Sequence, residues 1–322
     1  MLNIPLAQKI FDKHGLGRVD SVNKEAKGIT GGVFDVNNRF ILKIHREPTD
    51  PFITARNAAV CQIFKEHQIK APELIALDVS KEIIPDNYLI MTKLPGENLK
   101  EQWLDFTDDG KKKIFFDYGV MMAEIHLIKM PYFGDLTNPA QQFNNWSDCF
   151  SFRFQKNFDY LKDRRLLNEK TLEQVNDFFL KNKYLTEINF NPVLVHNDFQ
   201  TKNLKYVDGQ ISGIFDFDEC LAGHNEMEFI KTCLPFKKEK VWLDQIISGY
   251  KSIGGLSEDF PQRIKLYTLK FCLKVLTFNH AVNLLSPHLE DKFNWAIEKI
   301  LHEDWRYFDY PQHLWRQEGI YY

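Results

Sequence analysis

The chain has 322 residues, of which 44% are hydrophobic and 26% charged, values typical of a globular protein large enough for two domains. Its formal net charge of -3 gives no reason to expect nucleic acid as a partner. No segment approaches about eighteen consecutive apolar residues, and the five Cys lack a C-x-x-C spacing, so we expect a cytoplasmic protein without a membrane span, disulfide framework or zinc site.

The first pattern in chain order is a glycine-rich β-hairpin. The run Gly28-Ile29-Thr30-Gly31-Gly32 precedes two apolar strands that flank a turn at Asn37-Asn38. A two-residue turn would place Lys43 opposite Gly32. There the glycine backbone would allow phosphates to approach closely, and the ammonium would neutralise them.

A helix and a second hairpin are expected next. Asp50-Pro51 is typical of a helix N-terminus and predicts that a helix begins there. Strands at 83–84 and 88–91 would form a hairpin around Pro85-Asp86-Asn87. Pro95-Gly96 then predicts the boundary between a domain at 1–94, rich in strands, and a domain at 95–322.

The second domain is predicted to be mainly α-helical, because apolar residues recur at helical intervals. The expected helices cover 114–128, 146–161, 172–180, 242–250, 264–285 and 293–301. On the first of these, we expect His126 to be a buried packing residue.

A polar motif between the helices carries the most specific chemistry. His196-x-Asp198-x4-Asn203 is followed by Asp216 in an apolar strand. Amide and carboxylate oxygens are ligands that suit Mg2+, and Asp198 is positioned before them to accept a proton from a hydroxyl. A base followed by two metal ligands predicts phosphoryl transfer.

The spacing inside this motif predicts a second tight hairpin. Asp208-Gly209 is a strong two-residue turn signal. If Val207 faces Gln210, Asn203 lies across from Ile214, and its side chain can reach the same divalent ions as the side chain of Asp216.

Together these motifs resemble the aminoglycoside phosphotransferase and choline kinase family of small-molecule kinases, from about residue 28 to about residue 230. The matching segments are the glycine-rich hairpin with its Lys strand, 88–97, 122–127, Phe133-Gly134-Asp135-Leu136, His196-x-Asp198-x4-Asn203 and Asp216. The resemblance implies an α+β, two-lobed protein-kinase-like fold with a small β-rich N-lobe and a larger, mainly helical C-lobe.

The resemblance also implies roles for single residues. Asp198 would be the catalytic base, Asn203 and Asp216 the Mg2+ ligands, and Lys43 the partner of the α and β phosphates of ATP, with GTP as an alternative. The other expected nucleotide-binding positions are Gly31 and Gly32 over the phosphates, and Thr92, Lys93 and Leu94 as the hinge that meets the purine. His196 would support the catalytic loop, and Glu228 would brace it.

One position departs from the family pattern. Similar kinases carry a Glu on the helix after the Lys strand, and this chain has Asn57 there. An amide oxygen can hold a Lys but adds no charge attraction. Three explanations remain: a tolerated substitution, a partner elsewhere such as Glu66 or Glu47, or a weakened nucleotide site.

The acceptor is the least defined part of the prediction. Carboxylates that follow Asp216 would suit a cationic small molecule with a hydroxyl group, and are equally well explained as solvated or supporting residues; they are Asp218, Glu219, Glu226 and Glu228. An antibiotic kinase of the aminoglycoside type is favoured by the short N-lobe and the Phe133-Gly134 segment.

Two alternatives remain. A choline or ethanolamine kinase is favoured by His196-Asn197-Asp198 followed by Gln200. A catalytically weak nucleotide-binding module is favoured only by Asn57. The sequence indicates no oligomeric state.

Overall fold

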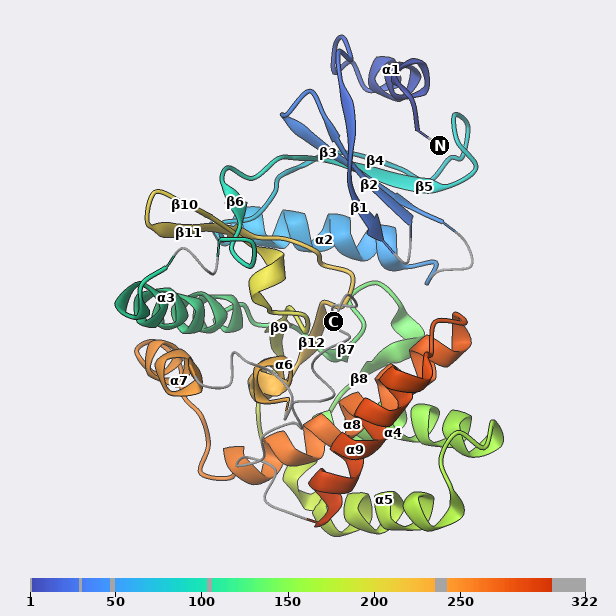
Figure 1. The fold of residues 1–322 in the computed structure, drawn as a ribbon, viewed down its shortest axis with the longest axis vertical. Helices are drawn as coiled ribbons and strands as arrows, with labels where there is room; N and C mark the ends of the chain where they lie inside the picture. The colour runs from blue at the N-terminus through green and yellow to red at the C-terminus, as the bar shows by residue number, and fades with distance from the viewer. Residues whose placement is uncertain (1, 29–30, 47–49, 103–105, 235–241, 303–322) are drawn as a thin grey trace. The chain divides into compact units, whose positions relative to one another are not determined.

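The computed structural model describes residues 2–28, 31–46, 50–102, 106–234 and 242–302 (Figure 1). The chain divides into two compact units. The first unit comprises Met1–Ile114, Asp135–Ala140 and Gln200–Cys220, and the second unit comprises Phe115–Gly134, Gln141–Phe199 and Leu221–Tyr322. The first unit therefore includes the segment around Asp216. The boundary expected at residue 94 stays a prediction.

The first unit is built from two small sheets and two helices. Its elements are α1 (Ile4–Lys13), β1 (Val22–Gly28), β2 (Gly31–Val36), β3 (Phe40–His45), α2 (Ile53–Glu66), β4 (Leu74–Asp78), β5 (Asn87–Thr92), β6 (Glu97–Asn98), the short 3-10 turn η4 (Thr201–Asn203), β10 (Leu204–Val207) and β11 (Gln210–Ile214). The five-stranded sheet has the order β1-β2-β3-β5-β4, and the three-stranded sheet has the order β11-β10-β6.

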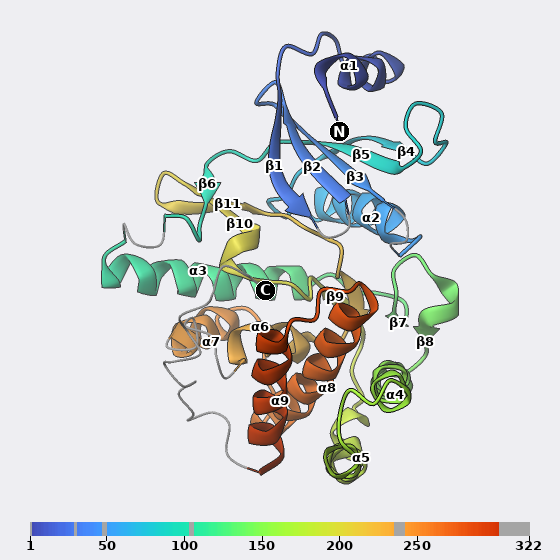
Figure 2. The ribbon, with the colours of Figure 1, turned by 45° about the vertical axis from the view of Figure 1, so that its right-hand side comes forward.

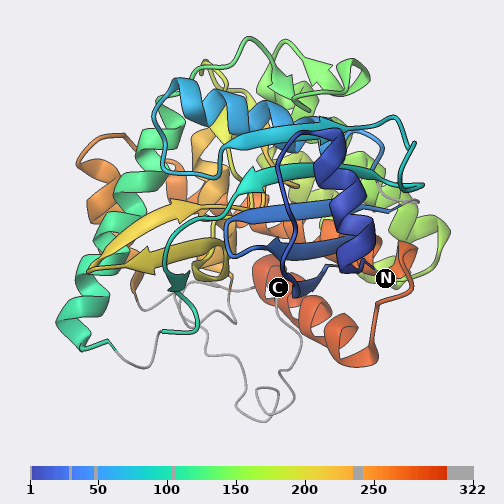
Figure 3. The ribbon, with the colours of Figure 1, turned by 90° about the horizontal axis from the view of Figure 1, so that it is seen from above.

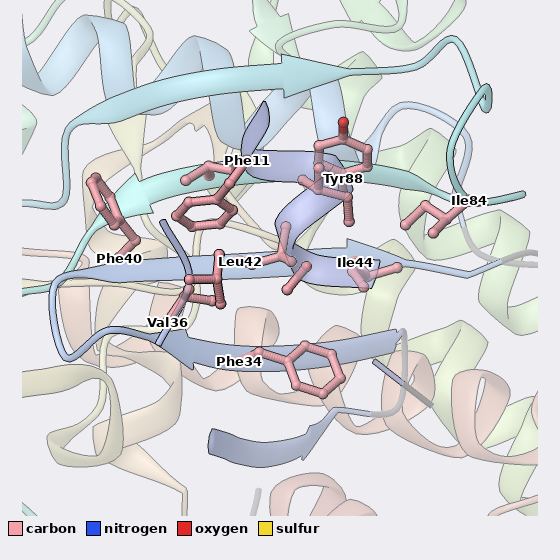
Figure 4. Packing of buried hydrophobic residues seen from close by; sticks show 12 residues of the cluster. Phe11, Phe34, Val36, Phe40, Leu42, Ile44, Ile84 and Tyr88 are labelled. Atoms are coloured by element: carbon pink, nitrogen blue, oxygen red, sulfur yellow. The ribbon is translucent and has the colours of Figure 1, made fainter. Parts of the chain in front are cut away.

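The five-stranded sheet carries a helix on each face. Side chains on a strand alternate between faces, so Leu42 and Ile44 point one way and Lys43 the other. Leu42 and Ile44 belong to a buried cluster with Phe11 of α1 (Figure 4). Figure 3 shows α1 crossing over the strands on this side. Lys43 points to the other face, where its ammonium meets Asn57 of α2.

The glycine-rich hairpin has a register one residue different from the prediction. Val36 pairs with Phe40, so Lys43 lies opposite Val33 instead of Gly32. The turn at Asn37 and Asn38 does form, with both residues at positive φ of 59° and 51°. Arg39 donates its N–H to the carbonyl of Val36 and closes the turn, so the ladder begins one residue later.

The second hairpin is also displaced by one residue, at its far end. Val207 faces Gln210 as predicted, but Ser212 is an extra residue on β11, and Leu204 therefore pairs with Ile214. Such a β-bulge shifts all later pairs by one position. The Ser212 hydroxyl donates to the carbonyl of Pro95 at 2.6 Å, which gives the extra residue its own partner.

Two other element predictions were wrong. Helix α2 begins at Ile53 and not at Pro51, because the Asp50 carboxylate accepts the N–H of Phe52 and the carbonyl of Asp50 accepts that of Ile53. The strand that precedes β5 and forms a hairpin with it is β4 instead of 83–84, and residues 79–86 connect the two.

The second unit is mainly α-helical, as predicted. Its elements are α3 (Asp108–His126, shared with the first unit), β7 (Phe133–Gly134), β8 (Gln142–Phe143), α4 (Trp146–Asp163), α5 (Glu169–Asn182), β9 (Val193–Val195), β12 (Leu221–Gly223), the 3-10 turn η5 (Asn225–Phe229), α6 (Ile230–Cys233), α7 (Leu243–Lys251), α8 (Phe260–Ala281) and α9 (Pro287–His302). All six predicted helices are present, with shifted ends. Helix α8 packs against α4 and α9 (Figure 2).

The core of the second unit is aromatic, and hydrogen bonds join several of its polar rings. Trp146 donates its indole N–H to the Tyr267 hydroxyl at 2.6 Å. His126 is buried and shares a hydrogen bond of 2.8 Å with Tyr250, so its predicted packing role is confirmed. Within the described parts of the chain, no helix has the length and apolar character to span a membrane.

Candidate active site

Lys43 is the centre of a buried polar cluster in the first unit. Its ammonium donates to Asp218 at 2.5 Å, to Asp216 at 2.9 Å and to the amide oxygen of Asn57 at 3.4 Å. Burial alone would lower the pKa of Lys43, but the two carboxylates outweigh this effect and raise the pKa above its ordinary value. Lys43 is therefore a cation fixed on the inner strand β3, on the face of the sheet toward α2.

The carboxylate of Asp218 is surrounded by side chains of the protein. Its Oδ1 accepts from Asn57 Nδ2 at 2.9 Å and lies 3.6 Å from Nε2 of His45. Burial would raise the pKa of Asp218, but the charge of Lys43 lowers it below the usual range, so the carboxylate is ionised. The contact between Lys43 and Asp218 was not predicted from the sequence.

Helix α2 holds the backbone of this segment as well. Arg56 donates to the carbonyl of Asp218 at 2.7 Å, and to the carboxylates of Asp50 at 2.6 Å and Asp135 at 2.5 Å. Thr137 donates its backbone N–H to the same Asp135 carboxylate at 2.9 Å. Sequence reasoning assigned no role to Arg56 or Asp135, although Asp135 belongs to a segment that matches the family pattern.

Asn203 and Asp216 are brought together by the backbone. The carbonyl of Asn203 accepts the N–H of Phe215, the residue before Asp216, at 3.0 Å. Asp216 has a positive φ of 71°, which is strained for a residue with a side chain, and such strain is typical of functional positions.

The donor set at these two residues fits a hard cation. Carboxylate and amide oxygens are ligands that Mg2+ accepts, usually with waters and phosphate oxygens in addition. Among the described residues, no three His, Cys, Asp or Glu side chains form a metal site by themselves. A magnesium ion held by Asp216 would therefore need the Asn203 amide and ligands from outside the protein.

Gly31 and Gly32 begin strand β2, and both are sterically required there. A Cβ on Gly31 would lie 1.6 Å from the carbonyl oxygen of Ile44, and a Cβ on Gly32 would lie 2.5 Å from the Phe34 ring. The Ile29-Thr30 part of the glycine-rich run lies outside the described residues. Strand packing alone thus accounts for these two glycines, and their predicted contact with phosphates stays a prediction.

The predicted hinge follows β5. The N–H groups of Thr92 and Lys93 donate to the carbonyls of Glu73 and Arg39, both at 2.9 Å. The Lys93 side chain is bound to Asp35 at 2.7 Å. The N–H groups of Thr92 and Lys93 are thus used within the protein, so a hydrogen bond from this segment to a purine would come from the N–H of Leu94 or from a backbone carbonyl.

The alternatives for the partner of Lys43 can now be compared. The amide oxygen of Asn57 accepts a hydrogen bond of 3.4 Å from Lys43, so Asn57 is one partner of this ammonium. Glu66 is exposed and accepts a hydrogen bond from Gln62, so it is not the partner. Glu47 lies outside the described residues.

In the second unit, the loop with the predicted base is held by Glu228. The buried Glu228 carboxylate accepts the backbone N–H of His196 at 2.7 Å and of Asn197 at 2.8 Å. The N–H of Asp198 donates to the His196 ring at 3.2 Å. The supporting contacts expected of His196 and Glu228 are therefore present, around a residue, Asn197, with a positive φ of 61°.

Asp198 itself has a cationic neighbour that sequence reasoning missed. Its carboxylate is ion-paired with Lys231 of α6, and both side chains are largely buried. Lys231 comes three residues after Glu228 in the chain, which is the one signal that could have placed it near the same loop.

The acidic residues that follow Asp216 are mostly bound by the protein. Asp218 pairs with Lys43, Glu228 accepts two loop N–H groups, and Glu226 forms a buried ion pair of 2.6 Å with Arg263. These three carboxylates already have partners within the protein, so they do not support a binding site for a cationic acceptor.

Comparison of sequences identifies one family. A model described as the phosphotransferase enzyme family matches residues 27–262. No curated protein matches the sequence of the chain.

Solved structures with the same fold cover nearly the whole chain. A streptomycin-ATP-APH(2")-IIa ternary complex has a TM-score of 0.68 at 15% identity and covers 96% of this chain and 99% of its own. A putative fructosamine-3-kinase from Thermobifida fusca YX-ER1 has a TM-score of 0.68 at 16% identity, covering 92% and 100%. The GDP complex of wild-type aminoglycoside 2'-phosphotransferase-IIIa has a TM-score of 0.67 at 11% identity, covering 94% and 99%. At these identities the likeness shows the fold, and the predicted protein-kinase-like α+β fold is confirmed.

Proposed function

The chain belongs to the phosphotransferase enzyme family and is a small-molecule phosphotransferase, and from this premise we propose that it transfers a phosphoryl group from ATP to a hydroxyl group of a small molecule. The observation that carries the proposal is the contact of 2.9 Å between Lys43 and Asp216. These residues are 173 positions apart in the chain. The family pattern requires them to act on one nucleotide.

On the nucleotide side, Lys43 would bind the α and β phosphates. Its buried ammonium keeps its charge and is held on a rigid strand, so it can neutralise phosphate oxygens without reorganisation. Gly31 and Gly32 would cover the phosphates, and Thr92 to Leu94 would meet the purine. GTP is a second possible donor, since one structural neighbour is described as a GDP complex.

Asp216 and Asn203 would hold magnesium. When bound, Mg2+ neutralises the charge that develops on the transferring phosphoryl group. The side chain of Asp216 is 37% exposed, so its carboxylate would be accessible to the metal. Asn203 is buried and would offer its amide oxygen from a fixed position.

Asp198 would act as the base. Its carboxylate would orient the acceptor hydroxyl and accept its proton as the new O–P bond forms. Glu228 and His196 hold the backbone on either side of it. Lys231 would hold the carboxylate of Asp198 in place before the acceptor binds.

For the acceptor, we propose a hydroxylated molecule that carries an amine. The support comes from neighbours described as an aminoglycoside phosphotransferase with streptomycin and a putative fructosamine-3-kinase. A choline or ethanolamine kinase is the alternative. We also keep the expectation, from the sequence, that the enzyme works in the cytoplasm.

The test is to replace Asp198 with Asn and to measure turnover and nucleotide binding separately. Asp198→Asn should reduce phosphoryl transfer by at least about 10³-fold, because the hydroxyl loses its base, while MgATP still raises the melting temperature. The acceptor panel at fixed MgATP comprises aminoglycosides, fructosamines, choline and ethanolamine. Full activity of the variant would refute the assigned base, and phosphorylation of choline alone would favour the alternative.

A further inference from the structure

Lys43 takes its negative partner from an unusual place in the chain. The helix α2 offers it only the neutral amide of Asn57, at 3.4 Å, while the carboxylate of Asp218 lies at 2.5 Å. We propose that Asp218, in place of a carboxylate on the helix, is the residue that positions Lys43. Asn57 in turn holds the carboxylate of Asp218 by a hydrogen bond. The inference rests on the proposed role of Lys43 in binding the nucleotide.

The carboxylate of Asp218 is fixed well enough for this role. Asn57 donates to it at 2.9 Å, and Arg56 binds the carbonyl of the same residue at 2.7 Å. Nε2 of His45 lies 3.6 Å away, and the other ring nitrogen of His45 is hydrogen-bonded to Thr54 at 2.9 Å. Two successive residues of α2 thus hold both the side chain and the backbone of Asp218.

Asp216 is the less suitable of the two carboxylates as the positioning partner of Lys43. Its carboxylate is the proposed ligand of magnesium and would be shared between the metal and the ammonium. The side chain of Asp216 is 37% exposed, against 20% for Asp218. Asp218, which has no proposed metal role and is the more buried, is therefore the carboxylate that orients Lys43.

Asn57 is suited to this arrangement because an amide has both an acceptor and a donor. Its oxygen faces the ammonium of Lys43, and its nitrogen donates to Asp218 and to the carbonyl of Ile53. A carboxylate at position 57 would lose the donor and face Asp218 with a like charge. The amide at 57 and the carboxylate at 218 therefore form one functional pair.

This pairing predicts a reciprocal result that a merely structural role would not produce. Asp218→Asn should lower kcat/KM for MgATP on the order of 10²-fold. This is the size of effect expected when an active site loses one fixed group that stabilises charge. Asn57→Asp should also be harmful, because it adds a like charge. The double variant Asn57→Asp with Asp218→Asn, called the swap, exchanges the two groups with little change of shape. Its kcat/KM for MgATP should be at least about tenfold higher than that of Asp218→Asn alone.

The matched control is Asp208→Asn, the same chemical change at an exposed turn position where Asn also tolerates the positive φ of 49°. It should leave kcat/KM unchanged. The four variants and the unchanged protein would be compared in MgATP titrations, both by melting temperature and by acceptor-independent ATP hydrolysis. If Asp218→Asn does not fold, Asn57→Asp alone and the swap still give the comparison.

The outcomes separate this inference from the proposed function. Activity of Asp218→Asn within about threefold of the unchanged protein, or a swap no better than the worse single variant, overturns the inference and leaves the function standing. Absence of any nucleotide response in the unchanged protein overturns both. Harmful single changes with recovery in the swap establish the pair.

Discussion

The guanidinium of Arg56 and the carboxylate of Asp135 form an ion pair of 2.5 Å, with both side chains more than nine-tenths buried. Arg56 also binds the carbonyl of Asp218, so one side chain of α2 holds two separate segments of the first unit. A buried charge that loses its partner is costly, because the remaining charge is desolvated without compensation.

Replacing Arg56 with Met should therefore destabilise the protein. The change keeps most of the apolar stem but removes the guanidinium that neutralises the buried carboxylate of Asp135, and the free energy of unfolding should fall by about 3 kcal/mol. Urea denaturation measures this value. Arg18→Met is the control, since Arg18 is 85% exposed in its pair with Asp20 and should change stability by less than about 1 kcal/mol. Equal effects of the two changes would contradict the prediction.

Glu228→Gln should slow turnover while nucleotide binding stays the same. The Glu228 carboxylate accepts two backbone N–H groups of the loop with Asp198. In the variant, the amide nitrogen would face one of these donors, at a cost of about 1–3 kcal/mol, which corresponds to a loss in kcat of roughly tenfold or more.

The measurements for Glu228→Gln are kcat and the shift of melting temperature with MgATP. Glu124→Gln, an exposed position on α3, is the matched control and should behave like the unchanged protein. An unaltered kcat in Glu228→Gln would show that the loop keeps its geometry without the charge.

His224 should make the protein less stable as the pH falls below neutrality. Burial, together with the positive charge of Arg263 and the neighbouring His126, holds the pKa of His224 well below the ordinary value of about 6.5. Below that pH the unfolded chain binds a proton that the folded protein excludes. The contribution to the free energy of unfolding therefore falls by up to about 1.4 kcal/mol per pH unit.

Thermal or urea unfolding between pH 7 and about 5 tests this contribution. His224→Asn keeps a polar atom toward the Tyr267 hydroxyl, which lies 3.2 Å from the ring, and removes the titrating group. The variant should lose less stability over this range than the unchanged protein. His67→Asn, at an exposed position, should leave the pH dependence as it was. Parallel curves for all three proteins would refute the prediction.

Turn chemistry located both hairpins, but not their full registers. Asn37-Asn38 and Asp208-Gly209 adopt the positive φ angles that tight turns require. Arg39 adds a third residue to the first turn, where its N–H donates to the carbonyl of Val36. Ser212 is a bulge position whose hydroxyl donates to the carbonyl of Pro95, far along the chain. A turn signal specifies neither the exact loop length nor a bulge with a distant partner, so both registers differ by one residue from the prediction.

Strand β4 was not predicted from the sequence, for a different reason. It lies at the edge of its sheet, and its apolar residues Ile75 and Leu77 are 39% and 40% exposed. The alternation that marks a half-buried strand is therefore weak. The helices of the second unit were found because their apolar faces are regular.

The proposed site residues also differ in whether a local pattern marks them. Lys43, Asp198, Asn203 and Asp216 stand in recognisable local motifs, from which their roles are predicted, and these roles stay predictions. Asp218 and Lys231 bind Lys43 and Asp198 through contacts that span 175 and 33 positions. Only a folded chain reveals these partners.

The pairing of an amide on α2 with a carboxylate after β11 has an evolutionary consequence. Under the proposed pairing, an acidic residue at 57 should arise together with, or after, the loss of the charge at 218, since otherwise a third carboxylate would join Asp216 and Asp218 around Lys43. Among descendants of a common ancestor these two sites should change in step. The carboxylate beside Lys43 could thus be supplied by either of two positions far apart in the sequence, 57 or 218, while its place in the folded protein stays the same.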